Sequence, residues 1–334
     1  MTNHASTKQQ RWKKILLIIT SLVLLGVLTA YLYVSFQPIA DNTEDNTKVV
    51  ATSTPAVLVS KPAPTITTGP KLFITPKEIK QGEPALITVE GLGSISSVES
   101  FTFDNRPLVI FLHQGQVTAL LGVDLRAIPG TYPLVLSLKD GRQINENFII
   151  GERTIIRAPF DIPEKLGGNT PASEKELIST LAQEGKIINA LPTSNQKLWT
   201  EKFGSPLNTS LVVTDPYGYT RLIGKSTMPH KGVDLQAPMG TPVYAMNRGV
   251  IGFADDLRNY GNTVVIDHGL GLQTVYMHLS EIKVAPSQMV EKGELIGMSG
   301  DTGYVLGPHL HLTVRIWDIS IDPMKFLELL GGDN

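Results

Sequence analysis

Residues 308–316 alternate between polar and apolar side chains, which is the pattern of a β-strand with two different faces. The polar face would carry His309, His311, Thr313 and Arg315. The opposite face, apolar enough to lie on a core, would carry Leu310, Leu312, Val314 and Ile316. The two imidazoles would lie about 7 Å apart on one side of the strand. Both can therefore contribute to a single site.

Residues 204–334 as a whole show short strand-like runs divided by glycine-rich turns, for example at 241–245, 262–266 and 272–277. Residues 267–271 join the last two runs and are typical of a hairpin connection. Strict alternation puts His278 on the same face as Thr274 and Tyr276, so we expect His278 to end a strand on that face. His268 lies at the turn, where a structural or solvent-facing role is expected.

The N-terminal part contains an uncharged apolar run at residues 15–36. As a helix this run is about 33 Å long, enough to cross a hydrocarbon core. The preceding residues 1–14 end in basic side chains, which predicts a cytoplasmic N-terminus and export of everything after Phe36. A cleaved signal peptide is the alternative, but its apolar region is normally shorter and ends in a small-x-small site. We therefore expect an uncleaved transmembrane anchor.

Three further segments lie between this run and residue 204. Residues 37–70 are rich in Thr, Ser, Pro, Asp and Asn, without apolar periodicity, and predict a flexible linker. Residues 71–157 return to short strands separated by turns, which is typical of a small β-sandwich. Residues 158–203 indicate a helical connector that begins with Ser173 as N-cap and Glu176 at N3. Trp199 and Phe203 are expected to pack onto the domain that follows.

Composition restricts the chemistry. A net charge of −2 over 334 residues gives no indication of nucleic-acid binding. The chain has no Cys, so it has no disulfides, and any zinc site must use imidazole and carboxylate ligands. Five of the seven His lie in the last third. His230 and Asp234 can supply two ligands and the His-x-His strand a third, which leaves two His for proton transfer.

Several motifs in this region resemble those of the M23 (lysostaphin/LytM-type) zinc metallopeptidases. The three that carry the resemblance are His230-Lys231-Gly232-Val233-Asp234, Tyr276-Met277-His278-Leu279 and Gly307-Pro308-His309-Leu310-His311. The likeness extends from about residue 206 to 323. It implies a mainly β chain with an antiparallel LytM-type peptidase domain, preceded by the β-sandwich, the helical connector and the transmembrane helix. Residues 71–157 more weakly resemble the β-rich domain that precedes the peptidase in some membrane-anchored members.

The resemblance implies roles for five residues. His230, Asp234 and His311 correspond to the zinc ligands, and His278 and His309 correspond to the catalytic pair. A zinc-activated water would hydrolyse peptide bonds in peptidoglycan stems or cross-links. D-Ala-to-diamino-acid cross-links and oligoglycine bridges are both open as targets, and the first is expected for an anchored protein. Which of the two His acts as general base is also open.

Two departures from the family pattern affect residues near these five. Thr313 stands where a Glu is usual after the His-x-His motif, which removes any support that the Glu would give to a ligand. Residues 217–221 are one residue longer than the usual Phe-Gly-x-Arg, so the role of Arg221 is open.

Two alternatives to a peptidase remain. One is a non-catalytic regulator on the same fold that activates another wall hydrolase, although such relatives typically lack some ligands. The other is a wall-binding module, which would leave the His and Asp set without a purpose. The expected partners are peptidoglycan peptides, the membrane and cell-wall or division proteins, with the C-terminal domains in the periplasm or on the cell-wall side.

Overall fold

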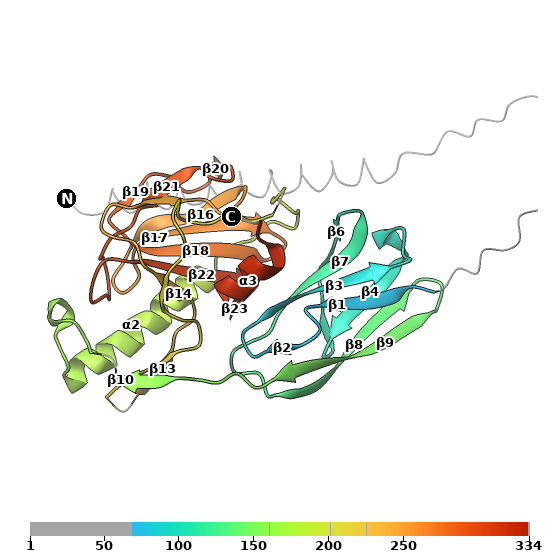
Figure 1. Cartoon of the computed structure of the whole chain (residues 1–334), viewed down its shortest axis with the longest axis horizontal. Helices are drawn as coiled ribbons and strands as arrows, with labels where there is room; N and C mark the ends of the chain where they lie inside the picture. The colour runs from blue at the N-terminus through green and yellow to red at the C-terminus, as the bar shows by residue number, and fades with distance from the viewer. Residues whose placement is uncertain (1–68, 160, 201, 225, 333–334) are drawn as a thin grey trace, which may run out of the picture. The chain divides into compact units, whose positions relative to one another are not determined.

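The computed structural model describes residues 69–159, 161–200, 202–224 and 226–332. The predicted cytoplasmic segment, the predicted anchor at 15–36 and the predicted linker up to residue 68 lie outside these ranges. Within the described ranges no helix combines the length and the hydropathy that a membrane crossing needs. Strands account for most of the regular structure, which confirms the mainly β fold class (Figure 1).

Residues 71–151 form two facing sheets, as the alternating runs predict. The first has the order β1-β3-β7-β6, with strands Lys71–Thr75, Pro84–Glu90, Gln116–Gly122 and Ile110–His113. The second has the order β2-β9-β8-β4-β5, with strands Ile79–Lys80, Gln143–Gly151, Gly130–Leu138, Val98–Phe103 and Arg106–Pro107. Side chains such as Ile87, Leu134 and Phe148 share one apolar core, so this part is a β-sandwich.

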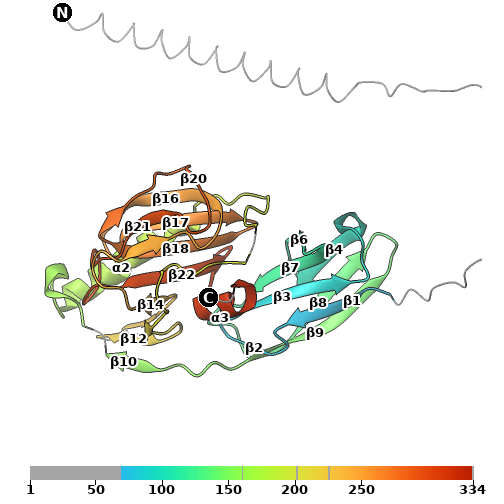
Figure 2. The same cartoon turned by 45° about the horizontal axis from the view of Figure 1, so that its top comes forward.

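The C-terminal part is built on one large, mainly antiparallel sheet. Its main path runs β11-β14-β22-β18-β17-β16-β20, with strands Val213–Asp215, Val233–Leu235, Leu310–Ile316, Leu272–Leu279, Gly261–Gly269, Gly249–Leu257 and Met289–Val290. β23 (Ile319–Ile321) pairs with β22. Figure 2 shows β16, β17, β18 and β22 side by side.

Two small sheets and two helices surround this large sheet. One small sheet has the order β15-β21-β19, with strands Pro242–Tyr244, Leu295–Met298 and Glu281–Ile282. The other has the order β10-β12-β13, with strands Arg157–Pro159, Thr220–Ile223 and Ser226–Pro229. Among the described residues, the α-helices are α2 (Pro171–Asn189) and α3 (Pro323–Leu330), and short 3₁₀ turns occur at Ile95–Ser97 and Glu164–Leu166.

The predicted two faces of residues 308–316 are present in β22. Its apolar face contributes Leu310, Leu312, Val314 and Ile316 to the main core. On the other face His311 is paired with Asp234 of β14 and with Met277 of β18. This second face is buried as well, because α2 lies over part of it: Arg315 Nη1 donates to Ile188 O at 3.1 Å.

The predicted face of His278 is wrong. Tyr276 lies in the main core, whereas the His278 ring lies 5.8 Å from the ring of His311 on the opposite face. The pairing of β17 with β18 shifts between Val264↔Tyr276 and Asn262↔Leu279, which is a β-bulge, and His278 has φ +62. The extra residue in the bulge turns the His278 side chain onto the face that strict alternation gives to its neighbour.

The predicted start of the helix is also wrong. α2 begins at Pro171, and its N-cap is Thr170, whose side chain accepts from Ser173 N at 3.2 Å. Proline is favoured in the first helical turn because it lacks an N–H that would be unsatisfied there. Ser173 is therefore inside the helix, where its hydroxyl donates to Gly167 O. Gly185, which weakens a helix, is accommodated without a break.

The described residues form one compact unit, in which the sandwich contacts the C-terminal part. Arg153, after the last sandwich strand, pairs with Asp322 at 2.8 Å and with Glu83 at 3.4 Å. Trp199 and Phe203 are buried in the main core, as predicted, and Trp199 packs edge-on against Phe111 of the sandwich. The main core thus extends from the peptidase-like sheet to the sandwich.

Candidate metal centre

Three polar side chains from separate segments meet at one end of β14 and β22. His230 follows β13, Asp234 lies in β14 and His311 lies opposite Asp234 in β22. His230 Nε2 is 3.1 Å from Asp234 Oδ1 and 3.0 Å from His311 Nδ1. His311 Nδ1 is 2.7 Å from the same carboxylate oxygen. The strand pairing therefore brings together the three residues that the sequence predicts as ligands.

Gly232 allows this approach of β14 to β22. A Cβ at this position would lie 2.4 Å from His311 Nε2 and 2.5 Å from Leu312 O. Contacts below 3.0 Å essentially do not occur for real Cβ atoms, and one of these is to backbone, which cannot rotate away. Glycine is needed here for the close approach of the two strands. Its φ angle lies outside the left-handed region, so backbone conformation is not the reason.

In each ligand imidazole, the nitrogen that faces away from the cluster has a hydrogen-bond partner of its own. His230 Nδ1 lies 3.0 Å from Pro216 O, and because a carbonyl only accepts, the proton is on Nδ1 and Nε2 is free for the cluster. His311 Nε2 lies 3.0 Å from Thr313 Oγ1, so its Nδ1 can face the cluster. Thr313 thus provides the contact that the absence of the family's usual Glu had put in doubt.

Arg221 orients the carboxylate of Asp234. Its Nη2 donates to Asp234 Oδ2 at 2.9 Å and to Asp215 Oδ2 at 2.8 Å. One oxygen of Asp234 is therefore bound to the guanidinium and the other faces the two imidazoles. All three side chains are largely buried. The longer spacing around residues 217–221 has not removed the arginine from the site.

His278 and His309 lie beside this cluster, with ring centroids 5.0 Å apart. His278 Nδ1 donates to Thr302 O at 2.9 Å, and His309 Nδ1 donates to Gly307 O at 2.8 Å. Both therefore keep Nε2 available. His309 Nε2 is 3.4 Å from Asp234 Oδ1. The two predicted catalytic residues are thus brought next to the three predicted ligands.

Burial and neighbouring charges shift the pKa values in this cluster. Burial raises the pKa of Asp234, but its contacts with His230, His309 and His311 outweigh this effect and hold the pKa well below its ordinary value. Burial lowers the pKa of His311 to about 4. Burial, with the charges of His311 and His309, lowers the pKa of His278 well below its usual value. A carboxylate and neutral imidazoles at neutral pH are the protonation states that bind metals.

The donor set fits zinc. His230, Asp234 and His311 offer two imidazole nitrogens and one carboxylate oxygen, all within 4.8 Å of one another. Zinc bonds to such atoms at about 2.0–2.2 Å, and three protein ligands with one further position is the usual catalytic arrangement. Among the described residues, these are the three His, Asp or Glu side chains whose ligand atoms lie close enough together to hold one ion.

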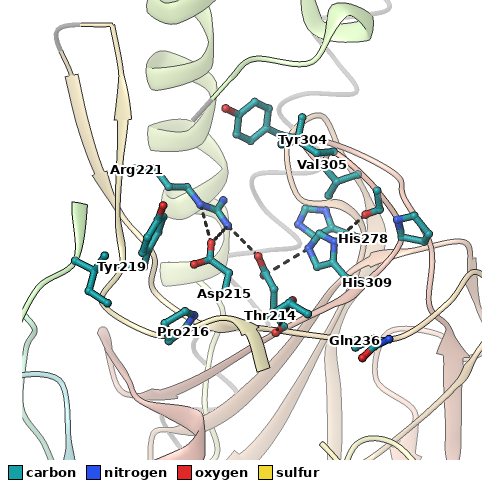
Figure 3. A pocket seen from close by; sticks show the side chains of 15 residues that line it. Thr214, Asp215, Pro216, Tyr219, Arg221, Gln236, His278, Tyr304, Val305 and His309 are labelled. Atoms are coloured by element: carbon teal, nitrogen blue, oxygen red, sulfur yellow. Dashed lines mark hydrogen bonds and ion pairs between the residues drawn. The ribbon is translucent and has the colours of Figure 1, made fainter. Parts of the chain in front are cut away.

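A pocket of about 550 Å³, here called the loop pocket, opens beside the pair His278 and His309. One wall is formed by residues 214–216 with Tyr219 and Arg221, and the other by residues 304–309. Figure 3 shows Arg221 and Asp215 across the pocket from His278 and His309. Its size is that of a small-molecule or peptide site.

Other histidines lie away from the centre. His268 is fully buried in β17, where Nδ1 donates to Arg248 O at 2.9 Å and Nε2 lies 2.8 Å from Thr274 Oγ1. Its expected structural role agrees with this, but it does not face solvent. His113 ends β6 in the sandwich. The sequence did not point to Asp215 as a site residue, because a single acidic residue before a glycine-rich turn does not indicate a functional site.

Comparison with known proteins identifies relatives of the C-terminal part. Residues 228–323 match the family model described as Peptidase family M23. The chain is 32% identical over 202 residues to the peptidoglycan DD-endopeptidase ShyA of Vibrio cholerae, covering 58% of this chain and 46% of that protein. It is 42% identical over 114 residues to the DD-carboxypeptidase/endopeptidase Mpg of Neisseria meningitidis, covering 34% and 26%. The chain thus spans about half or less of these curated relatives.

A solved structure, described as a putative peptidase M23 from Pseudomonas aeruginosa, has a similar fold. The TM-score is 0.56 at 25% identity, and the match covers 76% of this chain and 96% of that one. The matched portion therefore extends beyond the C-terminal part. The resemblance inferred from the motifs is confirmed by both kinds of comparison.

Proposed function

We propose that the chain is a zinc-dependent endopeptidase of peptidoglycan peptides, on the premise that residues 228–323, which match the model of peptidase family M23, are a member of that family. The observation that carries the proposal is the convergence of three metal-binding side chains with two further imidazoles. The substrate class is supported by relatives named as peptidoglycan DD-endopeptidase and DD-carboxypeptidase/endopeptidase. Their names also favour D-Ala-to-diamino-acid cross-links over oligoglycine bridges.

In this proposal His230, Asp234 and His311 hold the zinc. When bound there, zinc supplies Lewis-acid chemistry: it lowers the pKa of a water and polarises a carbonyl. Arg221 holds the outer oxygen of Asp234, and Thr313 accepts from His311 Nε2, so the ligands keep their orientation.

His278 and His309 handle protons. Each has its Nδ1–H committed to a backbone carbonyl, which leaves Nε2 directed at the reacting region. In this proposal one imidazole accepts a proton at Nε2 from the attacking water. The other, when it is protonated at Nε2 as well as at Nδ1, donates to the oxygen that becomes negative. The chain retains every one of these groups, so the regulator alternative has no missing ligand to support it.

The test is digestion of purified peptidoglycan by the full chain loaded with zinc. We expect soluble fragments and new amino termini, both abolished by a chelator and restored by added zinc. Asp234→Ala and His311→Ala should lose activity and bound zinc, whereas His113→Ala, remote in the sandwich, should keep both. Digestion that persists in Asp234→Ala and His311→Ala would contradict the ligand assignment. Inactive but zinc-loaded protein that stimulates another wall hydrolase would establish the regulator.

We also propose that residues 15–36 anchor the chain in a membrane with the C-terminal domains exported. The uncharged apolar run and the basic residues before it support this. Full chain that resists alkaline extraction from membranes, and whose C-terminal part is cleaved by protease added on the exported side, is the expected result. Release of a shortened soluble chain would instead support a cleaved signal peptide.

A further inference from the structure

A second pocket lies on the other side of the metal centre, between α2 and the large sheet. We call it the helix pocket. It has a volume of about 770 Å³ and includes His230, His278 and His311 in its lining. Its walls include residues of α2 between Ile178 and Asn189, as well as Thr313 and Arg315 of β22. Both pockets are lined by Arg221, His278 and Tyr304, so the centre lies where they meet.

The helix that forms this wall is held firmly. The buried carboxylate of Glu184 accepts from Asn259 N at 2.9 Å and from Tyr260 N at 3.3 Å. Ile188 packs with Val265, Val275 and Met277. α2 precedes the family match at 228–323, so this wall is a feature that the family domain alone does not supply.

The helix pocket is cationic. Its lining contains Lys186, Lys231, Arg221 and Arg315, against a single acidic side chain, Asp318. Arg221 is already paired with two aspartates. The other three cations therefore outnumber the acid, and a bound group with negative charge is favoured there.

The guanidinium of Arg315 donates to neutral acceptors and has no carboxylate bound to it among the described residues. Nη1 donates to Ile188 O at 3.1 Å and to Gln273 Oε1 at 3.4 Å, and Nη2 donates to Asn189 Oδ1. Each of these acceptors is neutral. The ammonium group of Lys186, on the last turns of α2, has no hydrogen bond or ion pair with another described residue. Burial lowers the pKa of Arg315, as expected for a guanidinium without a carboxylate partner.

From these observations we propose that the helix pocket is a subsite for the free carboxylate of the peptide substrate, bound by Lys186 and Arg315. This subsite rests on the proposed peptidase function and specifies which side of the cleaved bond each pocket binds. A terminal carboxylate lies on the C-terminal side of any cleaved bond. The C-terminal, amine-bearing product therefore occupies the helix pocket, and the acyl side occupies the loop pocket. His311 and Arg315 are four residues apart on one strand, about 13 Å, which places the carboxylate within about four residues of the cleaved bond.

Gly185 allows a direct test of the pocket. Beyond the helix itself, a Cβ at this position would have one described neighbour within 4 Å, Tyr260 Oη at 3.8 Å. Gly185→Leu should therefore project into the pocket while increasing helix propensity. Lys186→Ala removes the charge alone. Lys175→Ala, an exposed lysine on the same helix outside the pocket lining, is the matched control.

The substrate pair is one synthetic cross-linked stem peptide, made with a C-terminal carboxylate or a carboxamide. For the parent chain and Lys175→Ala, we expect kcat/KM to be about tenfold higher for the carboxylate, because charge-assisted hydrogen bonds contribute that much. The preference should fall to near one in Lys186→Ala and Gly185→Leu. Equal rates for both forms in the parent chain, or an unchanged preference in both pocket variants, would overturn the subsite.

A second measurement separates this proposal from the proposed function. The metal-free full chain is titrated calorimetrically with acetyl-alanyl-alanine and with its carboxamide. Tighter binding of the acid, lost in Lys186→Ala but not in Lys175→Ala, supports the subsite even if no peptide is cleaved. Equal binding of acid and amide overturns it whether or not the enzyme is active. Absence of cleavage alone contradicts only the peptidase function.

Discussion

Thr313 and Gly232 illustrate how much of the centre depends on single residues around the ligands. Thr313 accepts from His311 Nε2, and Gly232 leaves room for the same ring. Neither would bind the ion itself. The sequence flagged Thr313 only as a departure from a family pattern, because its contact depends on the pairing of two strands that lie far apart in the chain.

Removal of the Thr313 hydroxyl should weaken metal binding. Thr313→Val keeps the shape but leaves His311 Nε2–H without its acceptor, and loss of such a partner typically costs about 10–100-fold in affinity. Thr313→Ser keeps a hydroxyl and should stay within a few-fold of the parent. Competition with a chromophoric zinc chelator measures both. Equal affinities for Val and Ser variants would show that the hydroxyl does not support the ligand.

His268 should make stability dependent on pH. Burial lowers its folded-state pKa to about 4, against 6.5 for the free side chain. Between these values the unfolded chain binds the proton and the folded chain does not, so the free energy of unfolding falls as pH drops through that window. The maximum loss is about 3 kcal/mol. Urea unfolding from pH 7 to 4 should show a weaker pH dependence in His268→Asn, and identical slopes would contradict this assignment.

At the scale of elements, alternation predicted the two faces of β22 correctly because this strand is regular over its whole length. The same reasoning failed for His278, since a bulge changes the face and leaves no mark in the sequence. The predicted start of α2 was also wrong, because both Thr170-Pro171 and Ser173 have the residue types of a helix N-terminus, and the helix begins after Thr170. The helix pocket was beyond prediction, because it depends on how α2 docks.

The docking of α2 should depend on Glu184 far more than on other charges of the helix. Glu184→Ala leaves the buried N–H groups of Asn259 and Tyr260 without an acceptor, which costs about 2–3 kcal/mol. Glu176, also on α2, forms an exposed pair with Arg258. Glu176→Ala should therefore cost less than about 1 kcal/mol. Urea unfolding compares the two, and similar losses would mean that Glu184 does not anchor the helix.

At the scale of the whole molecule, the sandwich and the C-terminal part share contacts through Arg153. Its guanidinium pairs with Asp322, and it donates to Gln81 O at 2.7 Å and Tyr217 O at 3.3 Å. The sequence indicated two domains but could not show that they touch, because the arginine and its partners are up to 169 residues apart.

Arg153→Ala should loosen this connection. The substitution leaves Asp322 without its cation, at a cost of about 3 kcal/mol. We expect calorimetry to resolve one heat transition for the parent, and separate transitions for the sandwich and the C-terminal part in Arg153→Ala. Arg126→Ala removes an exposed sandwich pair and should retain the parent trace. A single transition in Arg153→Ala would mean that the apolar contacts alone couple the domains.

The position of α2 has a practical consequence for anyone preparing a minimal catalytic fragment. A chain trimmed to residues 228–323 would lose Ile188 and uncover Val275 and Met277, which are apolar and form part of one cluster with it. The same trimming strips Arg315 of two acceptors. Such a fragment invites aggregation and gives misleading substrate preferences. Expression boundaries should begin before β10, so that the upstream helix is produced together with the sheet it covers.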